Sequence, residues 1–180
     1  YGDEGQRSAF RTGTAERRRI AASDHVACLE PLLVCIKDDL AQTPLVAIGH
    51  RVVHGGRYRE PQRVTPAVME ELQRLRGYDP EHLPAEIELI REFARRYPHL
   101  PQVACFDTAF HGGMPQVARL LPIPRRYGNV GLQRYGFHGL SYAFLMKELV
   151  RVGKPGEANG RLILAHLGNG ASMAAIKDGQ

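Results

Sequence analysis

The chain has 180 residues, and 24 Lys and Arg against 19 Asp and Glu give it a formal net charge of +5 at pH 7. Hydrophobic residues make up 43% and charged residues 24%, values that are ordinary for globular proteins and exclude wholesale disorder. No apolar run approaches the roughly 20 residues that a spanning helix needs, so the sequence predicts no membrane partner. At roughly 100–200 residues per domain, the length allows one complete domain or parts of two.

Cysteine usage indicates the compartment. Cys28, Cys35 and Cys105 form no CxxC pair and leave one thiol over in any pairing scheme, which is typical of a reducing environment. The first thirty residues lack the apolar segment of a signal peptide. We therefore expect a cytoplasmic protein.

The first elements are weakly defined. Residues 1–20 are polar and rich in arginine, without an apolar period, which predicts an exposed loop or a frayed helix. Apolar positions recur at helical spacing over residues 26–36, and Pro31 should kink that helix. The apolar run 45–48 then predicts a buried strand that leads into residues 50–56.

The later elements have clearer boundaries. They are helices that start near residues 66 and 84, a strand over 102–106, a helix over 141–150, and a hairpin of strands 161–165 and 171–176. Strands that alternate with helices predict an α/β fold, and the closing hairpin predicts a mixed sheet.

Polar groups stand at the carboxyl ends of three predicted strands, where ligands bind in open α/β sheets. They are Arg51, Asp107 and His166, and glycines accompany each of them. Arg51 suits a bidentate grip on a carboxylate or phosphate, or a structural ion pair. Asp107 suits a base, an orienting group or a metal partner, or the cap of the next helix.

Two glycine-bracketed segments offer donors for an anion. The turn over residues 167–171 can present backbone N–H groups to phosphate, or it can be an ordinary Asn-Gly hairpin turn. His138, in RYGFHG (134–139), can donate to a developing phosphoryl or acyl charge, or it can be a structural histidine.

Two other classes of function are weighed against these. The spacing of His50 and His54 imitates a zinc pair, and with Asp107 it would build a metal-dependent hydrolase, but the cation of Arg51 beside it opposes metal binding. The arginine-rich start would suit nucleic acid, but no aromatic residues interleave with the Arg17–Arg19 run, so we expect no nucleic-acid partner.

Four segments together resemble the acetate kinase (acetokinase) family, within the sugar kinase and actin superfamily. They are HRVVHGG (50–56), FDTAFH (106–111), RYGFHG (134–139) and HLGNGAS (166–172), and their order and spacing match over roughly residues 23–180. The resemblance implies an incomplete ribonuclease H-like/actin-like ATPase fold, α/β with mixed sheets and flanking helices. It also implies reversible transfer of the ATP γ-phosphoryl group, with Mg²⁺, to a short-chain carboxylate, acetate first, giving an acyl phosphate.

The resemblance also implies a role for each matching residue. Asp107 and His138 are catalytic, and His138 stabilises the phosphoryl transition state. Arg51 grips the substrate carboxylate, while Val53 and Phe137 line the acyl pocket. The residues that would contact the nucleotide phosphates are His166, Leu167, Gly168, Asn169 and Gly170. Because a carboxylate is already a competent nucleophile, we expect Asp107 to orient groups or partner a metal rather than act as a general base.

Some positions depart from the family pattern. Glu81 stands where the family commonly has a leucine of the acyl pocket, and Leu140 and Tyr142 stand where it has threonine and histidine. These changes leave the preferred acid open, with a propionate- or butyrate-type kinase as the alternative.

Several parts of the family pattern have no counterpart here, namely the first phosphate loop, the second substrate arginine, the adenosine-binding segments and the metal-binding glutamate. We therefore expect an internal piece that lacks the family's dedicated metal ligands, so that we assign no metal-site residue here, and that has no kinase activity alone. Residues 1–114 would belong to the acyl-substrate domain and residues 115–180 would open the nucleotide-binding domain. Unpaired sheet edges favour a homodimer.

Overall fold

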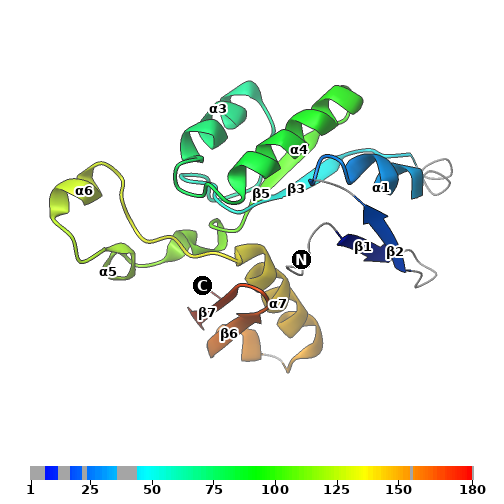
Figure 1. The fold of residues 1–180 in the computed structure, drawn as a ribbon. Helices are drawn as coiled ribbons and strands as arrows, with labels where there is room; N and C mark the ends of the chain where they lie inside the picture. The colour runs from blue at the N-terminus through cyan, green and yellow to red at the C-terminus, as the bar shows by residue number, and fades with distance from the viewer. Residues whose placement is uncertain (1–6, 12–16, 22–23, 36–43, 155, 180) are drawn as a thin grey trace.

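The computed structural model describes residues 7–11, 17–21, 24–35, 44–154 and 156–179 (Figure 1). The strands are β1 (Arg7–Arg11), β2 (Arg17–Ala21), β3 (Ile48–Val52), β4 (Gln62–Arg63), β5 (Gln102–Phe106), β6 (Arg161–Leu167) and β7 (Ala171–Lys177). The α-helices are α1 (Leu29–Cys35), α3 (Pro66–Leu75), α4 (Leu83–Arg96), α5 (Gln116–Arg119), α6 (Arg125–Asn129) and α7 (Gly139–Val152). Two short 3-10 helices are η1 (Phe110–Gly113) and η2 (Glu157–Asn159).

A three-stranded sheet with the order β3-β5-β4 lies at the centre of the molecule. β3 and β5 are parallel, with Arg51 opposite Cys105, whereas β4 runs antiparallel to β5. α3 and α4 lie on one side of the sheet, and α7 lies on the other side in the view of Figure 1. The predicted mixed α/β architecture is confirmed.

The main core fills the space between the sheet and the two helices. It consists of Val52, Val68, Leu72, Leu75, Leu83, Ile87, Ile90, Ala104 and Phe106. The sequence predicts these helices because their ends are marked: the Thr65 hydroxyl accepts a hydrogen bond from Val68 N–H (3.3 Å), and Pro66 occupies the first helical position. Both predicted helices are confirmed.

A second group of elements consists of α7 and the antiparallel hairpin of β6 and β7. Alternate hairpin residues pack toward α7, and Ile176 is buried there. The opposite face is apolar but exposed, with Ile163, Leu167 and Met173 each at least 75% accessible. The predicted hairpin is confirmed, with slightly longer strands.

Three expectations for the first fifty residues are wrong. Residues 7–11 and 17–21 form an antiparallel strand pair instead of a loop or helix, because backbone pairing does not need the apolar period that we searched for. Pro31 is the third residue of α1, where its missing N–H has no intrahelical partner to lose, so no kink is required. The strand predicted at 45–48 starts only at Ile48, and Val46 is 78% exposed.

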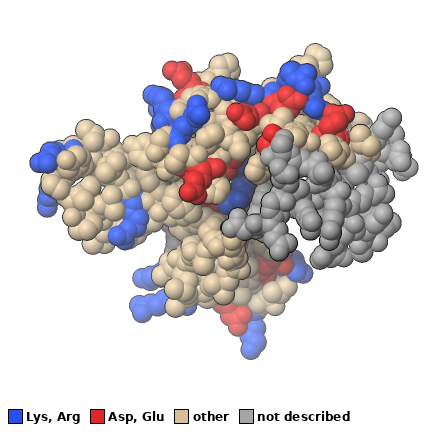
Figure 2. All heavy atoms as spheres, viewed as in Figure 1, with Lys and Arg blue, Asp and Glu red and all other residues tan. Residues whose placement is uncertain are grey.

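Residues 114–133 leave the body of the protein and carry α5 and α6 at the left of Figure 1. This excursion contains Arg119, Arg125 and Arg126 and no Asp or Glu, and Figure 2 shows only basic charges at its far end. It therefore places positive charge on that side of the molecule. None of the helices in the described part of the chain has the length and apolar character that a bilayer crossing requires.

Candidate active site

Parallel pairing of β3 with β5 brings Arg51 and Asp107 together. Arg51 Nη2 and Nε donate to Asp107 Oδ2 at 2.6 and 3.1 Å. The Asp107 side chain is 1% exposed, whereas that of Arg51 is 55% exposed. The pair therefore has a buried anionic end and a half-exposed cationic end, so Arg51 is in a structural ion pair and also lies at the surface of the site.

The two carboxylate oxygens of Asp107 differ in their contacts. Within the described residues, Oδ1 is buried and has no hydrogen-bond partner. No backbone N–H of the following 3-10 helix uses the carboxylate as a cap, because that helix begins after Ala109 without a side-chain cap. The helix-cap interpretation of Asp107 is therefore wrong. A buried acceptor without a partner is unfavourable, so Oδ1 is available to accept a hydrogen bond from a group in the adjoining cavity.

His138 lies next to Asp107 because of a backbone contact. Gly139 N–H donates to the carbonyl oxygen of Asp107 (3.0 Å), and this bond ties the end of β5 to the start of α7. His138 itself precedes α7 in a left-handed conformation, with φ 58° and ψ 24°. Its Nδ1 lies 2.8 Å from Ser172 Oγ, and its ring stacks on that of His166 with centroids 4.0 Å apart.

The electrostatic surroundings disfavour the imidazolium form of His138. Burial lowers the pKa of His138 below its ordinary value, and the neighbouring His166 lowers it further, with smaller contributions of the same sign from Arg51 and His111. Asp107 opposes them. His138 is therefore a neutral donor or acceptor over a wider pH range than an ordinary histidine.

The glycines of the β6–β7 turn serve close packing. Neither Asn169 nor the two adjacent glycines adopts a positive φ, so the interpretation as an ordinary Asn-Gly hairpin turn is wrong. Gly168 N–H donates to Gly170 O (3.1 Å) and is thus already used. A Cβ on Gly170 would come within 3.3 Å of the His138 ring. The turn lies against His138 because it has no side chain there.

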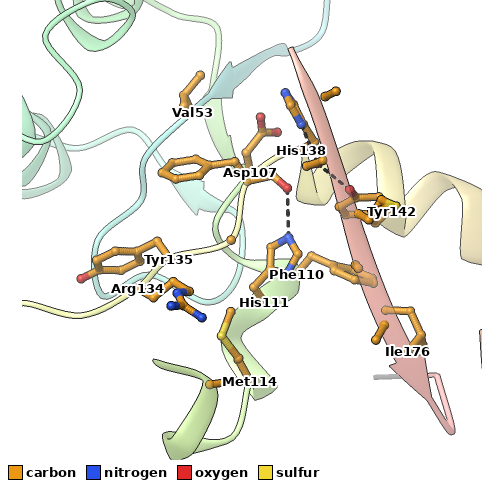
Figure 3. Close-up of a pocket in the computed structure, with 18 of the residues that line it drawn as sticks. Val53, Asp107, Phe110, His111, Met114, Arg134, Tyr135, His138, Tyr142 and Ile176 are labelled. Carbon is orange, nitrogen blue, oxygen red and sulfur yellow. Dashed lines mark hydrogen bonds between the residues drawn. The ribbon is translucent and has the colours of Figure 1, made fainter. Parts of the chain in front are cut away.

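One cavity of about 1030 Å³ joins these groups. Of the predicted site residues, it is lined by Arg51, Val53, Asp107, Phe137 and His138. Figure 3 shows Val53, Asp107 and His138 at one end of the cavity and Arg134 and Tyr135 along its side. The predicted residues 166–170 do not line it, although His166 reaches the site through its stack on His138.

The wall of the cavity differs from the expectation at residue 81. Glu81 is exposed and does not line the cavity, whereas Asp79 and His82 of the same segment do. His82 N–H donates to Asp79 Oδ1 (3.1 Å), and His82 Nδ1 lies 2.9 Å from the same oxygen. The departure at residue 81 therefore does not place the Glu81 carboxylate against the cavity.

Sequence reasoning missed Glu86. Both oxygens of its carboxyl group lie 3.2 Å from Val53 N–H, which they accept, so Glu86 supports the backbone of a cavity residue. Burial raises the pKa of Glu86 to about 7. The signal was present, because Glu86 falls on the helix stripe that contains Leu83 and Ile90, where an acid is unusual.

The raised pKa of Glu86 predicts a pH-dependent stability. The folded chain holds a proton that the unfolded chain loses, so the free energy of unfolding should fall as pH rises from about 4.5 to about 7. After discounting for partial exposure, we expect a decrease of about 2 kcal/mol that Glu86→Gln abolishes. Urea denaturation across this pH range measures it. Glu88→Gln, at an exposed position of the same helix, should show the same pH dependence as the wild type. If Glu86→Gln also kept the pH dependence of the wild type, Glu86 would not be the group responsible.

The histidines proposed for zinc are occupied elsewhere. His50 is buried on the core side of β3 with its Nε2 2.6 Å from the Gln102 amide, and His54 Nδ1 accepts Gly56 N–H (3.0 Å). Burial lowers the pKa of both. The residues that the structure describes contain no group of three or more His, Cys, Asp or Glu that could hold a metal ion, so the hydrolase alternative has no site among them.

Comparison with known proteins shows similarity to acetate kinases. The acetate kinase of Methylocella silvestris is 44% identical over 161 residues, which are 89% of this chain and 40% of that protein. That of Nitrobacter hamburgensis is 47% identical over 146 residues, 81% of this chain and 36% of the relative. The chain thus spans about 40% of the length of the curated relatives it matches.

Solved structures give the same result for the fold. The crystal structure of Porphyromonas gingivalis acetate kinase has a TM-score of 0.80 at 31% identity and covers 96% of this chain and 45% of its own. That of a propionate kinase from Francisella tularensis has a TM-score of 0.83 at 31% identity, covering 97% and 45%. The expected actin-like ATPase fold is confirmed as a partial one. The sequence model of the Acetokinase family matches residues 2–180, and the chain therefore belongs to the acetokinase family.

Proposed function

We propose that this chain supplies the carboxylate-binding side, and part of the phosphoryl-binding side, of an ATP-dependent acyl kinase. The reaction is reversible transfer of the γ-phosphoryl group of ATP to a short carboxylate, giving an acyl phosphate. One observation carries the proposal: Arg51, Asp107 and His138 come from three separate segments and line the same cavity.

Arg51 would bind the carboxylate. Its half-exposed guanidinium suits an anion, and the apolar side chains of Val53 and Phe137 line the same cavity. A short acid would therefore direct its charged end to Arg51 and its hydrocarbon end to this wall. Acetate is the first candidate substrate. Propionate and butyrate are the alternatives, and the solved propionate kinase with a similar fold favours testing them.

Asp107 and His138 would position the reacting groups and stabilise the charge of the transferring phosphoryl group. Phosphoryl transfer depends on alignment and charge stabilisation, and a carboxylate nucleophile has no proton to lose. Asp107 would hold the Arg51 guanidinium in place through its Oδ2 contacts. His138 would donate a hydrogen bond to the oxygens of the transferring group. The turn over residues 166–170 would run beside the phosphates, since Gly170 lies against His138.

Mg²⁺ fits this site as a hydrated ion. It supplies neutralisation of the phosphate charge, and it usually keeps several of its waters when bound. Asp107 Oδ1, buried and without a partner among the described residues, suits the acceptance of a hydrogen bond from such a water. The described residues contain no group of three or more His, Cys, Asp or Glu that could hold the ion directly.

We also propose the domain division near residue 114. All members of the main core cluster fall within residues 52–106, whereas the buried residues Tyr142 and Ile176 belong to α7 and β7. A cytoplasmic location agrees with Cys105, which is a free thiol. A homodimer agrees with the exposed apolar face of β6 and β7.

A chimaera tests the function. In the acetate kinase of Methylocella silvestris, the matching segment is replaced by the 161 matched residues of this chain, and acyl phosphate is trapped as the hydroxamate. We expect acyl phosphate from ATP, Mg²⁺ and acetate, with propionate and butyrate assayed in parallel. Residues 1–180 alone serve as the negative control. A folded chimaera that forms no acyl phosphate from any of the three acids would refute the proposal.

A further inference from the structure

The Tyr142 hydroxyl is enclosed at the edge of the cavity. The side chain of Tyr142 is 0% exposed, and its ring packs against those of Phe110 and His111. Among the described residues, its hydrogen-bond partner is Ser172 Oγ, at 2.5 Å. Ser172 Oγ also contacts His138 Nδ1 at 2.8 Å, so the three side chains form one chain of hydrogen bonds (Figure 3).

Assigning each hydroxyl hydrogen to an acceptor sets the direction of donation along these hydrogen bonds. If Ser172 donated to Tyr142, the buried Tyr142 hydrogen would have no acceptor, which is unfavourable. If Tyr142 and His138 both donated to Ser172, the hydrogen of Ser172, which lines the cavity, would have no acceptor among these side chains. The three groups satisfy one another only when Tyr142 donates to Ser172 and Ser172 donates to His138 Nδ1. That arrangement requires Nδ1 to be unprotonated.

We propose that Tyr142 and Ser172 are positioning residues that hold His138 as the neutral tautomer with its proton on Nε2. The role assigned to that proton, donation to the transferring phosphoryl group, rests on the function proposed above. The Nε2 edge of the ring lies against Gly170, because a Cβ there would come within 3.3 Å of Nε2 and Cε1. The donor is therefore presented beside the glycine turn.

The groups around His138 agree with a neutral ring. His166 on β6 stacks on the ring, Arg51 on β3 and His111 on η1 are further cations or potential cations, and all three lower the pKa of His138 together with burial. Asp107, after β5, is the charged group that opposes them. His166 is itself held by Ser141 Oγ, 3.1 Å from its Nδ1. The hydroxyls of Tyr142 and Ser172 thus select the neutral tautomer of His138, and the surrounding charges disfavour protonation of its second ring nitrogen.

The test reads the tautomer directly. The complete chain is labelled with ¹⁵N-histidine, and two-bond ¹H–¹⁵N correlation spectra are recorded across a pH series, with the His138 signals assigned by their loss in His138→Gln. We expect neutral His138 to be protonated on Nε2 with an acceptor-type Nδ1. Ser172→Ala should raise the share of the Nδ1-protonated tautomer about fivefold, the equivalent of one hydrogen bond of about 1 kcal/mol. Tyr142→Phe should raise it by a smaller factor, because Ser172 keeps its hydroxyl but can rotate.

The controls separate this proposal from the function. Tyr97→Phe, which removes a tyrosine hydroxyl remote from the cavity, should leave the His138 signals unchanged. A wild-type His138 protonated on Nδ1, or an unchanged tautomer ratio in folded Ser172→Ala, would overturn the proposal. Should a variant fail to fold, the wild-type spectrum still decides. Absence of acyl phosphate in the chimaera would refute the kinase function and leave this spectroscopic result standing.

Discussion

Arg51→Gln in the chimaera is expected to lower kcat/KM for the carboxylate by at least about 100-fold, because it removes a charged, fork-shaped donor from the acid. It should also lower the free energy of unfolding of the chain by about 1.5–3 kcal/mol, since the buried Asp107 carboxylate loses a charged partner. Steady-state kinetics and urea denaturation measure the two effects. Arg63→Gln, an exposed arginine on β4 of the same sheet, should change neither.

The double variant Arg51→Gln with Asp107→Asn separates structure from chemistry. Neutralising Asp107 removes the uncompensated buried charge, so stability should recover in part relative to Arg51→Gln. Activity should not recover, because the carboxylate of the substrate still lacks its cation. If Arg51→Gln changes stability but leaves kcat/KM intact, Arg51 is only a structural partner of Asp107.

Gly139→Ala is expected to be among the most damaging single-methyl changes in the chain. The added Cβ would lie 2.1 Å from the carbonyl oxygen of Asp107 and 2.7 Å from the Phe110 Cβ. The first of these neighbours is backbone, so it cannot rotate away, and we expect a loss of about 3 kcal/mol or more in the free energy of unfolding. The hydrogen bond from Gly139 N–H to Asp107 O should break as well.

The site should suffer beyond the loss of stability. Because that bond joins the end of β5 to the start of α7, the clash should displace His138 from Asp107 and lower kcat even under conditions where the variant is folded. Gly77→Ala offers a matched control, since nothing lies within 4 Å of its Cβ position, and it should stay within about 0.5 kcal/mol of the wild type. If the two variants had equal thermal stability, the close contact between Gly139 and the Asp107 carbonyl would not determine the stability of the fold.

The predictions that were confirmed are those with a local physical cause. α3 follows from the Thr65 cap and Pro66, and β5 follows from a short apolar run that ends at a charged residue. The pair of β1 and β2 was missed because its pairing is carried by backbone hydrogen bonds, which leave no apolar pattern in the sequence.

The sequence predicted which residues line the site better than it predicted the hydrogen bonds between them. Motifs singled out Arg51, Asp107 and His138, and the structure brings them to one cavity, although their roles remain predictions. The support of Val53 by Glu86 and the contact of Tyr142 with Ser172 depend on helix rotation and side-chain rotamer, which residue spacing does not specify. Tyr142 stood out only as a departure from a family pattern.

The left-handed backbone at His138 has a consequence for how this position can vary. A residue with a branched or bulky side chain is strained there by about 1 kcal/mol, whereas glycine and, to a lesser degree, asparagine accept it. Glycine at residue 138 would relieve this strain and remove the imidazole at once. Substitution at this one position therefore sets the demands of folding and of the site against each other, and comparing stability with activity measures which of them requires the histidine.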